Sequence, residues 1–329
     1  MDNIFINLKI NIDLSKLILQ YLTESHQKIL KRKLEKINKK EIIKHDCKLM
    51  IIIKISSCYN VFNYCAKFGK LKNIKCLFKN KFSCDKIIYY HAIRNGNFKI
   101  VKWLLKKKIP YDELAYIAAI KNGNLKNIKW LFKHKFPYFS SIFHTAAEVG
   151  NLENIKWLFK KKFPYDSDVF AHAASRGNFE VMTWFFENKF PYNKNVFSSA
   201  AKHGDLKMMI WLLENKFPYD EETFSNAALN GNLENMKWLL ENKFPHNEST
   251  FRCALLNGNS ENMEWLLKNK FPYSDESLYR VIGYANLDII KWLAENKFLD
   301  NPIVCSHLPS NDPEITNWLF ENGYISIEV

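Results

Sequence analysis

Hydrophobic and polar residues follow a pattern along most of this chain that predicts pairs of short helices, and residues 220–246 illustrate it. One apolar stripe has the i, i+3, i+4 spacing of a helical face and consists of Phe224, Ala227 and Ala228. A second stripe, also spaced for a helix, consists of Leu233, Met236, Leu239 and Leu240. We therefore expect a first helix that begins after Asp220 and a second helix over about 233–242.

The same pattern returns with a fixed period, and the tryptophans mark it most clearly. The first eight are 27 positions apart and the last step is 26: Trp103, Trp130, Trp157, Trp184, Trp211, Trp238, Trp265, Trp292 and Trp318. A fixed period of this size is typical of a solenoid, in which each repeat buries its apolar face against its neighbours. The pattern predicts about ten repeats over residues 58–329. Trp238, beside its helix stripe, is expected to seal the seam toward the next repeat.

Residues with special backbone or capping properties recur at fixed positions and predict where each helix begins and ends. An N-cap acceptor precedes each first helix, at Asp112, Asp166, Asn193, Asp220, Asn247 and Ser274. A glycine separates the two helices, at Gly69, Gly96, Gly123, Gly150, Gly177, Gly204, Gly231 and Gly258. The prolines of the Phe-Pro-Tyr/His turns end the second helices, and their aromatic rings are expected to close each repeat.

Residues 143–159 resemble the ankyrin repeat. His144 falls on the opening histidine of the family pattern. The small residues of that pattern are matched by Ala146, Ala147 and Gly150, and its final leucine pair by Leu158 and Phe159. Ankyrin repeats are about 33 residues long, so the shorter repeat lacks the segment in which ankyrins carry a β-hairpin finger. The resemblance implies an all-α, ankyrin-like helical-repeat solenoid with short turns and reduced or absent β-fingers. Trimmed arrays rich in Lys, Asn and Ile are similar to those of large DNA viruses that infect amoebae.

The ankyrin resemblance implies a non-enzymatic scaffold that binds a protein partner along the face formed by the first helices. Side chains on that face that change between repeats are the candidate contacts: His144, Thr145, Arg176, Lys202, His203 and Arg252. The partner itself is not encoded in the pattern, and we expect a monomer.

Charge is distributed unevenly and suggests an alternative function. Residues 1–138 hold 30 Lys+Arg and 9 Asp+Glu, a net charge of +21, whereas residues 139–329 have a net charge of −7. The basic residues 1–138 could bind nucleic acid electrostatically. We favour composition drift toward lysine, or a contribution to solubility, as the explanation of the excess. A ladder of one lysine per repeat, Lys81 to Lys297, is expected to be a row of solvated helix ends.

Residues 1–57 do not fit the repeat and are expected to form a helical, Lys-rich cap or extension. The basic run from Lys28 to Lys40 could instead be a nuclear import signal. A third possibility is an adaptor motif that connects the chain to a ubiquitin ligase through residues 1–57.

Catalytic groupings, phosphate-binding motifs and metal-ligand spacings are not found, so we expect no catalytic residues, no cofactor and no metal site. Cys65 and Cys76 occupy repeat positions that favour core packing over zinc binding. The seven cysteines without a close pair indicate reduced thiols. No apolar run reaches the length of a membrane span, and no secretory signal is evident. We expect a cytoplasmic or nuclear protein of an infected host cell that is not secreted.

Overall fold

The structure is a computed structural model that describes residues 62–63, 65–67, 71–79, 84–301, 304, 306–308 and 312–325. The chain divides into two compact units, Met1–Phe139 and Ser140–Val329, here called the N-terminal and C-terminal units. The expected cap or extension over residues 1–57 lies outside the described residues, as do Gly69 and Lys81. The boundary at residue 58 therefore stays a prediction.

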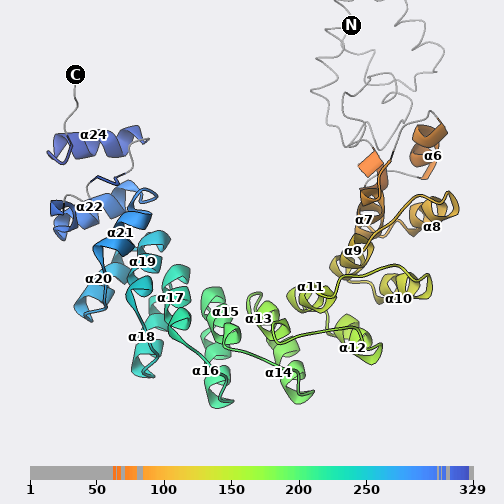
Figure 1. Ribbon diagram of the computed structural model, residues 1–329, viewed down its shortest axis with the longest axis horizontal. Coiled ribbons are helices and arrows are strands. Elements are labelled where there is room, and N and C mark those ends of the chain that lie inside the picture. Colours follow the sequence, from red (N-terminus) through yellow and green to blue (C-terminus); the bar gives the residue numbers. More distant parts are fainter. Residues whose placement is uncertain are drawn as a thin grey trace, which may run out of the picture. The chain divides into compact units, whose positions relative to one another are not determined.

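The described part of the N-terminal unit contains two rows of helices (Figure 1). The first helices of its repeats are α7 (Ile87–Arg94) and α9 (Leu114–Asn122), which pack side by side. The second helices are α6 (Leu71–Lys79), α8 (Phe98–Lys106) and α10 (Leu125–Lys133).

The C-terminal unit, taken by itself, also contains one row of first helices and one row of second helices (Figure 1). The first helices are α11 (Ile142–Val149), α13 (Val169–Ala174), α15 (Asn195–His203), α17 (Glu221–Asn230), α19 (Glu248–Asn257) and α21 (Asp275–Ile282). The second helices are α12 (Leu152–Lys160), α14 (Phe179–Glu187), α16 (Leu206–Glu214), α18 (Leu233–Glu241), α20 (Ser260–Lys268) and α22 (Leu287–Glu295). A short η1 (Phe298–Asp300) and α24 (Pro313–Glu321) follow. No described residue forms a strand, so the expected all-α solenoid without β-fingers is confirmed for this part of the chain.

The core of each repeat is formed largely by the first helix, on which one large apolar residue is followed by two small ones at i+3 and i+4. The phenylalanine of this pattern is fully buried in five successive repeats, at Phe143, Phe170, Phe197, Phe224 and Phe251. In the first four of these repeats the paired alanines beside it let neighbouring first helices approach closely, whereas Leu255 replaces the second alanine in α19. In α18 the buried residues are Asn235, Met236 and Leu239, whereas Leu233 and Leu240 of the predicted stripe are only half-buried.

The tryptophans of α14 and α16 contact the preceding repeat. Trp184 and Trp211 lie edge-to-face against Phe159 and Phe186, with ring centroids 5.6 and 5.4 Å apart. The expected seam toward the next repeat is therefore wrong in direction for these two repeats. Each indole ring covers the end of the preceding second helix, because the phenylalanine that it contacts lies in the last turn of that helix.

The predicted N-cap acceptors bind backbone N–H groups as expected. Asp220 Oδ1 accepts from Glu222 N at 3.1 Å, and Asn247 Oδ1 accepts from Ser249 N at 2.9 Å. Asp166 Oδ1 accepts from Asp168 N at 3.0 Å, although α13 itself begins at Val169 after a short turn. These bonds fix the direction in which each first helix leaves its turn.

The lysine ladder has a backbone role that the sequence interpretation missed. Eight of its members adopt the left-handed conformation, with φ between 54° and 62°: Lys108, Lys135, Lys162, Lys189, Lys216, Lys243, Lys270 and Lys297. After α18, Lys243 N donates to Leu240 O at 3.0 Å and Phe244 N donates to Leu239 O at 3.0 Å, which is the Schellman pattern. The residue that follows the lysine, such as Phe244, is 2% exposed. The ladder does lie at helix ends, but its position is one that glycine normally occupies.

Asparagine side chains connect successive repeats. Asn178 Nδ2 donates to Ala147 O at 2.7 Å and to Glu148 O at 2.9 Å in the preceding repeat. Asn257 Nδ2 donates to Leu229 O at 3.1 Å in the same way. These bonds satisfy carbonyl groups that the C-terminal end of each first helix leaves without an intrahelical partner.

Candidate interaction surface

The first helices of the C-terminal unit line an open hollow of ≈ 520 Å³, which we call the first-helix hollow. Four consecutive first helices, α11, α13, α15 and α17, contribute to it. Its lining consists of Glu148, Asp168, Ala171, His172, Ser175, Asn195, Ser198, Ser199, Lys202, Glu222 and Asn226. All except one of these side chains are polar, so the surface is suited to hydrogen bonds and ion pairs rather than to an apolar ligand.

Equivalent positions of the first-helix hollow carry different chemistry from repeat to repeat. One position, which returns once in each repeat, holds Asp168, then Asn195 and then Glu222. The core positions behind them keep phenylalanine and alanine throughout. Packing therefore dictates the residues behind the face and leaves the residues on it free to differ.

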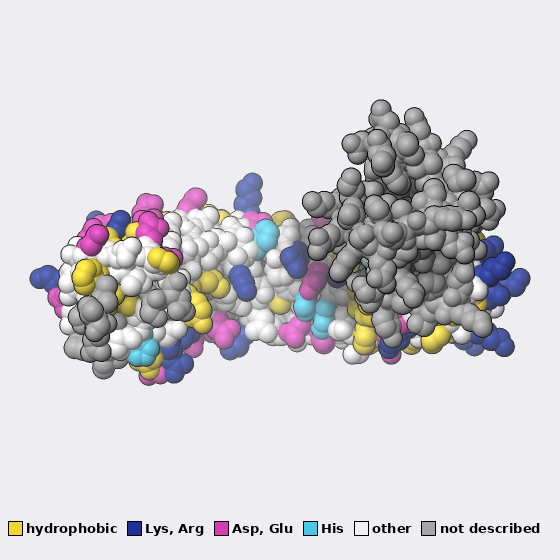
Figure 2. All heavy atoms as spheres, turned by 90° about the horizontal axis from the view of Figure 1, so that it is seen from above, with side chains coloured by type: hydrophobic (Ala, Val, Ile, Leu, Met, Phe, Trp, Pro, Cys, Tyr) yellow, Lys and Arg dark blue, Asp and Glu magenta, His cyan; other side chains and the backbone are white. Residues whose placement is uncertain are grey.

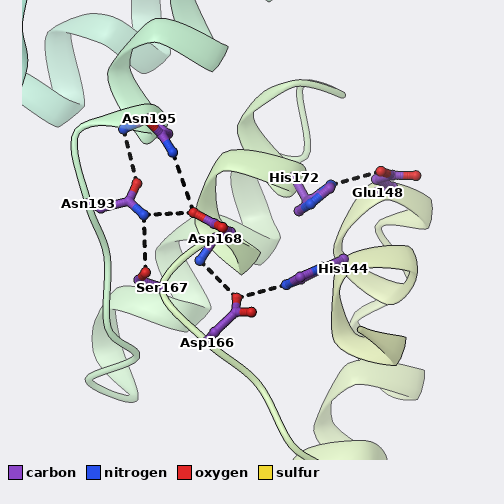
Figure 3. Close-up of polar contacts among 8 residues, drawn as sticks. All are labelled: His144, Glu148, Asp166, Ser167, Asp168, His172, Asn193 and Asn195. Atoms are coloured by element: carbon purple, nitrogen blue, oxygen red, sulfur yellow. Dashed lines mark hydrogen bonds and ion pairs between the residues drawn. The ribbon is translucent and has the colours of Figure 1, made fainter. Parts of the chain in front are cut away.

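Two histidines stack beside the hollow, each paired with a carboxylate (Figure 3). The rings of His144 on α11 and His172 on α13 have centroids 4.4 Å apart and planes inclined by 15°. His144 Nε2 lies 2.7 Å from Asp166 Oδ1, and His172 Nδ1 lies 2.8 Å from Glu148 Oε1. The stack arises because the two residues are 28 positions apart, one helical position out of register, in adjacent repeats.

The Asp166 carboxylate is held in its charged form by this arrangement. Partial burial acts to raise its pKa, but hydrogen bonds from His144 and from the backbone of Asp168 outweigh that effect and lower the pKa from 3.8. Asp166 thus serves both as the acceptor at the start of α13 and as the partner of His144.

A hydrogen-bonded bridge extends the cluster toward α15 (Figure 3). Asn193 Nδ2 donates to Asp168 Oδ1 at 2.7 Å and to Ser167 Oγ at 3.1 Å, while Asn193 Oδ1 accepts from Asn195 N at 3.0 Å. The turns before α13 and α15 are therefore tied together, which fixes Asp168 at the edge of the hollow.

Some of the candidate contact residues lie on or beside this surface. Lys202 lines the hollow and is exposed, and His144 belongs to the stacked pair. Thr145 is half-buried on α11, next to His144.

The other candidate residues lie away from the hollow. Arg176 is exposed in the turn after α13, and Arg252 on α19 donates to Ser249 Oγ at 3.2 Å. The ring of His203 covers Gly177, where an added Cβ would lie 2.6 Å from it. His203 therefore takes part in packing between repeats. Sequence reasoning did not single out Ser199, Glu222 or Asn226. Aligning the repeats would have found them, because the residues at their positions on the first helix change from repeat to repeat. The Phe and Ala of the core positions on the same helices do not change.

The remaining sequence predictions concern the cysteines, the motifs of residues 1–57, metal ligands and membrane spans. Cys65 is fully buried, as expected of a core residue, and burial, with a smaller contribution from Cys76, raises its pKa to about 12. The possible import signal and ligase-adaptor motif lie outside the described residues. Within the described ranges there is no group of three or more potential metal ligands and no helix long and apolar enough to cross a membrane.

Comparison with known proteins places a family match on part of the chain. Residues 62–141 match the family model of ankyrin repeats (3 copies). No curated protein matches the chain.

Solved structures of another helical-repeat protein share a loose likeness with this chain. The pentatricopeptide repeat protein PPR10 in complex with an 18-nt psaJ RNA element is 11% identical, with a TM-score of 0.38 over 96% of this chain and 54% of that one. PPR10 from maize is 12% identical, with a TM-score of 0.37 over 82% of this chain and 49% of that one. The chain thus spans about half the length of these structures. The family match supports ankyrin repeats over residues 62–141.

Proposed function

We propose that the chain is a non-enzymatic scaffold that binds a protein partner through the first-helix hollow of the C-terminal unit. The observation that carries the proposal is the contrast between an invariant core and a polar surface that changes from repeat to repeat across four adjacent helices. The family match supports the class of function, because ankyrin repeats suggest protein partners.

We further propose that the shortened repeats beyond residue 141 are ankyrin repeats that have lost the finger. The turns support this, since α12, α14, α16, α18 and α20 each end in a Schellman motif and the next N-cap acceptor follows within a few residues. Without fingers, recognition depends on the first-helix face. A monomeric state, a viral origin and a cytoplasmic or nuclear location in an infected cell stay predictions.

The hollow has the chemistry of a polar protein interface. Acidic side chains, Glu148 and Glu222, and basic side chains, His172 and Lys202, line the same hollow, so a partner must present donors and acceptors in matching places. Serine and asparagine side chains between these charges offer further hydrogen bonds without bulk. We therefore expect specificity to depend on charge position and not on net charge.

A charge-swap experiment tests the proposal. The double variant Lys202→Glu/Glu222→Lys reverses two exposed charges of the hollow and keeps the net charge. The matched control Glu214→Lys/Lys237→Glu makes the same swap on exposed positions of α16 and α18, in the row of second helices. Full-length proteins are used for affinity purification from cells, with quantitative mass spectrometry.

We expect a partner that the wild type and the control recover equally and that the hollow variant recovers at least about tenfold less, the effect of about 1.4 kcal/mol in binding. Recovery of the same partners by the hollow variant, or equal loss in the control, would refute the assignment of the surface. Absence of any enriched protein would refute the function.

A further inference from the structure

The second helices of the N-terminal unit carry a regular grid of lysines that the proposed scaffold function does not use. α6, α8 and α10 each have three lysines at positions i, i+3 and i+7, which places them on one helical face. These lysines, here called the lysine grid, are Lys72, Lys75, Lys79, Lys99, Lys102, Lys106, Lys126, Lys129 and Lys133. All of them are exposed.

No acidic residue interrupts the lysine grid. The three helices contain neither Asp nor Glu, and none of the grid lysines forms an ion pair with a carboxylate among the described residues. Acidic residues of the described N-terminal unit are found before its first helices, where Asp112 pairs with Lys86 at 3.3 Å. In the surface view, Lys and Arg side chains gather at the end of the molecule where Figure 1 shows α6, α8 and α10 (Figure 2).

Acidic residues replace some of these lysines in the C-terminal unit, although lysine remains at other positions, such as Lys156 and Lys237. The position of Lys99 becomes Glu153, Glu180 and Glu234 in α12, α14 and α18, and that of Lys106 becomes Glu187 in α14. Repeat packing therefore does not require lysine there. The concentration of charge on three adjacent helices is a property of the N-terminal unit.

An aromatic pair lies within the lysine grid. Between α8 and α10 there is an open hollow of ≈ 520 Å³, lined by Lys102, Leu105, Lys106, Trp130 and His134. The rings of Trp130 and His134 are stacked, with centroids 3.8 Å apart, and His134 Nδ1 lies 2.8 Å from Trp130 O. The hydrogen bond fixes the imidazole beside the indole, so two cations and a rigid aromatic platform share one hollow.

We propose that this grid is a docking surface for single-stranded nucleic acid. The phosphates bind the grid lysines, and a base stacks in the hollow on the Trp130–His134 pair. Grid lysines on one helix span about 10 Å, at 1.5 Å per residue, and neighbouring helices are about 8–10 Å apart, so the surface accommodates several consecutive phosphates.

The combination of charge with an aromatic platform distinguishes this ligand from other polyanions. An acidic protein or an anionic lipid surface would neutralise the lysines and leave the ring pair without a partner. In a duplex, the bases are stacked on one another and are not available to the rings. A single strand uses both the cations and the rings.

The test measures binding of the full-length chain to a fluorescently labelled oligothymidylate of about 20 nucleotides by anisotropy at several salt concentrations. The grid variant is Lys75→Gln/Lys102→Gln/Lys129→Gln. The matched control, Lys156→Gln/Lys237→Gln/Lys291→Gln, removes three lysines from the same helix position in the C-terminal unit. Equal thermal unfolding of both variants establishes that packing is intact.

Loss of three phosphate contacts is expected to weaken binding on the order of 100-fold at about 0.1 M salt and to reduce the slope of log K against log salt by about 2. The control is expected to change the affinity by less than about threefold, because its lysines lie outside the grid. Equal losses in the two variants, or no binding by the wild type at low salt, would overturn the proposal.

Two further probes separate the ligand classes. An abasic oligonucleotide with the same number of phosphates should bind at least about fivefold more weakly, because it cannot stack. Equal binding of the abasic strand, tighter binding of a duplex, or binding to phosphatidylserine vesicles in the absence of oligonucleotide binding would each reject a single-strand surface. These outcomes are independent of the C-terminal hollow, so failure here leaves the scaffold proposal standing.

Discussion

Replacing Lys243 with glycine should stabilise the C-terminal unit, although it removes a side chain and a charge. Lys243 has φ 58°, in the left-handed region, and it ends α18 in a Schellman motif. A residue with a Cβ is disfavoured there by about 1–2 kcal/mol, because the Cβ approaches the following carbonyl oxygen. Glycine removes that cost and loses about 0.5–1 kcal/mol more conformational entropy on folding. The expected net gain in the free energy of unfolding is about 0.5–1 kcal/mol.

The sign of this effect can be tested against the same substitution at a nearby lysine. Lys237 is exposed in the interior of α18, where Lys→Gly should destabilise by up to about 1 kcal/mol. Lys243→Ala removes the same ammonium group but keeps the Cβ, so it separates the loss of charge from the relief of the backbone. The chain offers a natural precedent at Gly323, which occupies the equivalent position after α24 with φ 79°.

The measurement is urea unfolding monitored by circular dichroism, with thermal unfolding as a second probe. A gain of about 1 kcal/mol should raise Tm by about 2–4 °C in a unit of this size. Lys162→Gly/Lys243→Gly should give about twice the gain, because these two lysines are three repeats apart and distant sites add. If Lys243→Gly destabilises as much as Lys237→Gly, or if Lys243→Ala gains as much as Lys243→Gly, the assignment of strain to the left-handed lysine is wrong.

Three further predictions concern single groups. Gly231→Ala should lower the free energy of unfolding by about 1–3 kcal/mol in urea melts, because φ is 85° and the new Cβ would lie 2.4 Å from Asn257 Oδ1; a neutral result would contradict the close contact. The Asp166 carboxyl should titrate below 3.8 in an NMR pH series. Its stabilising effect is therefore present above the unfolded pKa and is lost as pH falls through the folded pKa. His144→Ala should raise the titration midpoint of Asp166, and an unchanged midpoint would count against the His144–Asp166 pair. Cys65 should resist alkylation by iodoacetamide at about pH 8 in the folded chain and react once the chain is unfolded, since burial raises its pKa to about 12; rapid reaction in the folded state would contradict its burial.

Repetition makes much of this fold readable from the sequence. The core phenylalanine and its alanines, the glycine after the first helix and the acceptor before it recur with the period of the tryptophans over most of the array, so one interpretation applies to most repeats. The acceptor role of Asp220 and the left-handed conformation of Gly231 both follow from local chemistry, and the structure has both. Local interactions and amphipathic spacing determine them, so neighbouring repeats are not needed to find them.

The candidate interaction surface was harder to predict because it depends on neighbours that are distant along the chain. The sequence places His144 and His172 on adjacent first helices, one position out of register, and favours isolated histidines. That interpretation is wrong, because packing of α11 against α13 brings their rings to 4.4 Å. The sequence predicts that Trp238 is partly buried beside the apolar stripe of its helix. It does not predict whether such a tryptophan contacts the preceding or the following repeat, because that depends on how adjacent repeats pack.

The sequence by itself determined an all-α array of paired helices, its core and most of its caps, because these follow from hydrophobic periodicity and local backbone preferences. Tertiary structure decided what those helices present to a partner. It placed lysines in a left-handed position, since the buried Phe244 and its Schellman hydrogen bonds require that turn whatever the preceding side chain. It also brought Lys102 and Lys106 of α8 into one hollow with Trp130 and His134, because the distance between repeats is set by packing and not by position along the chain.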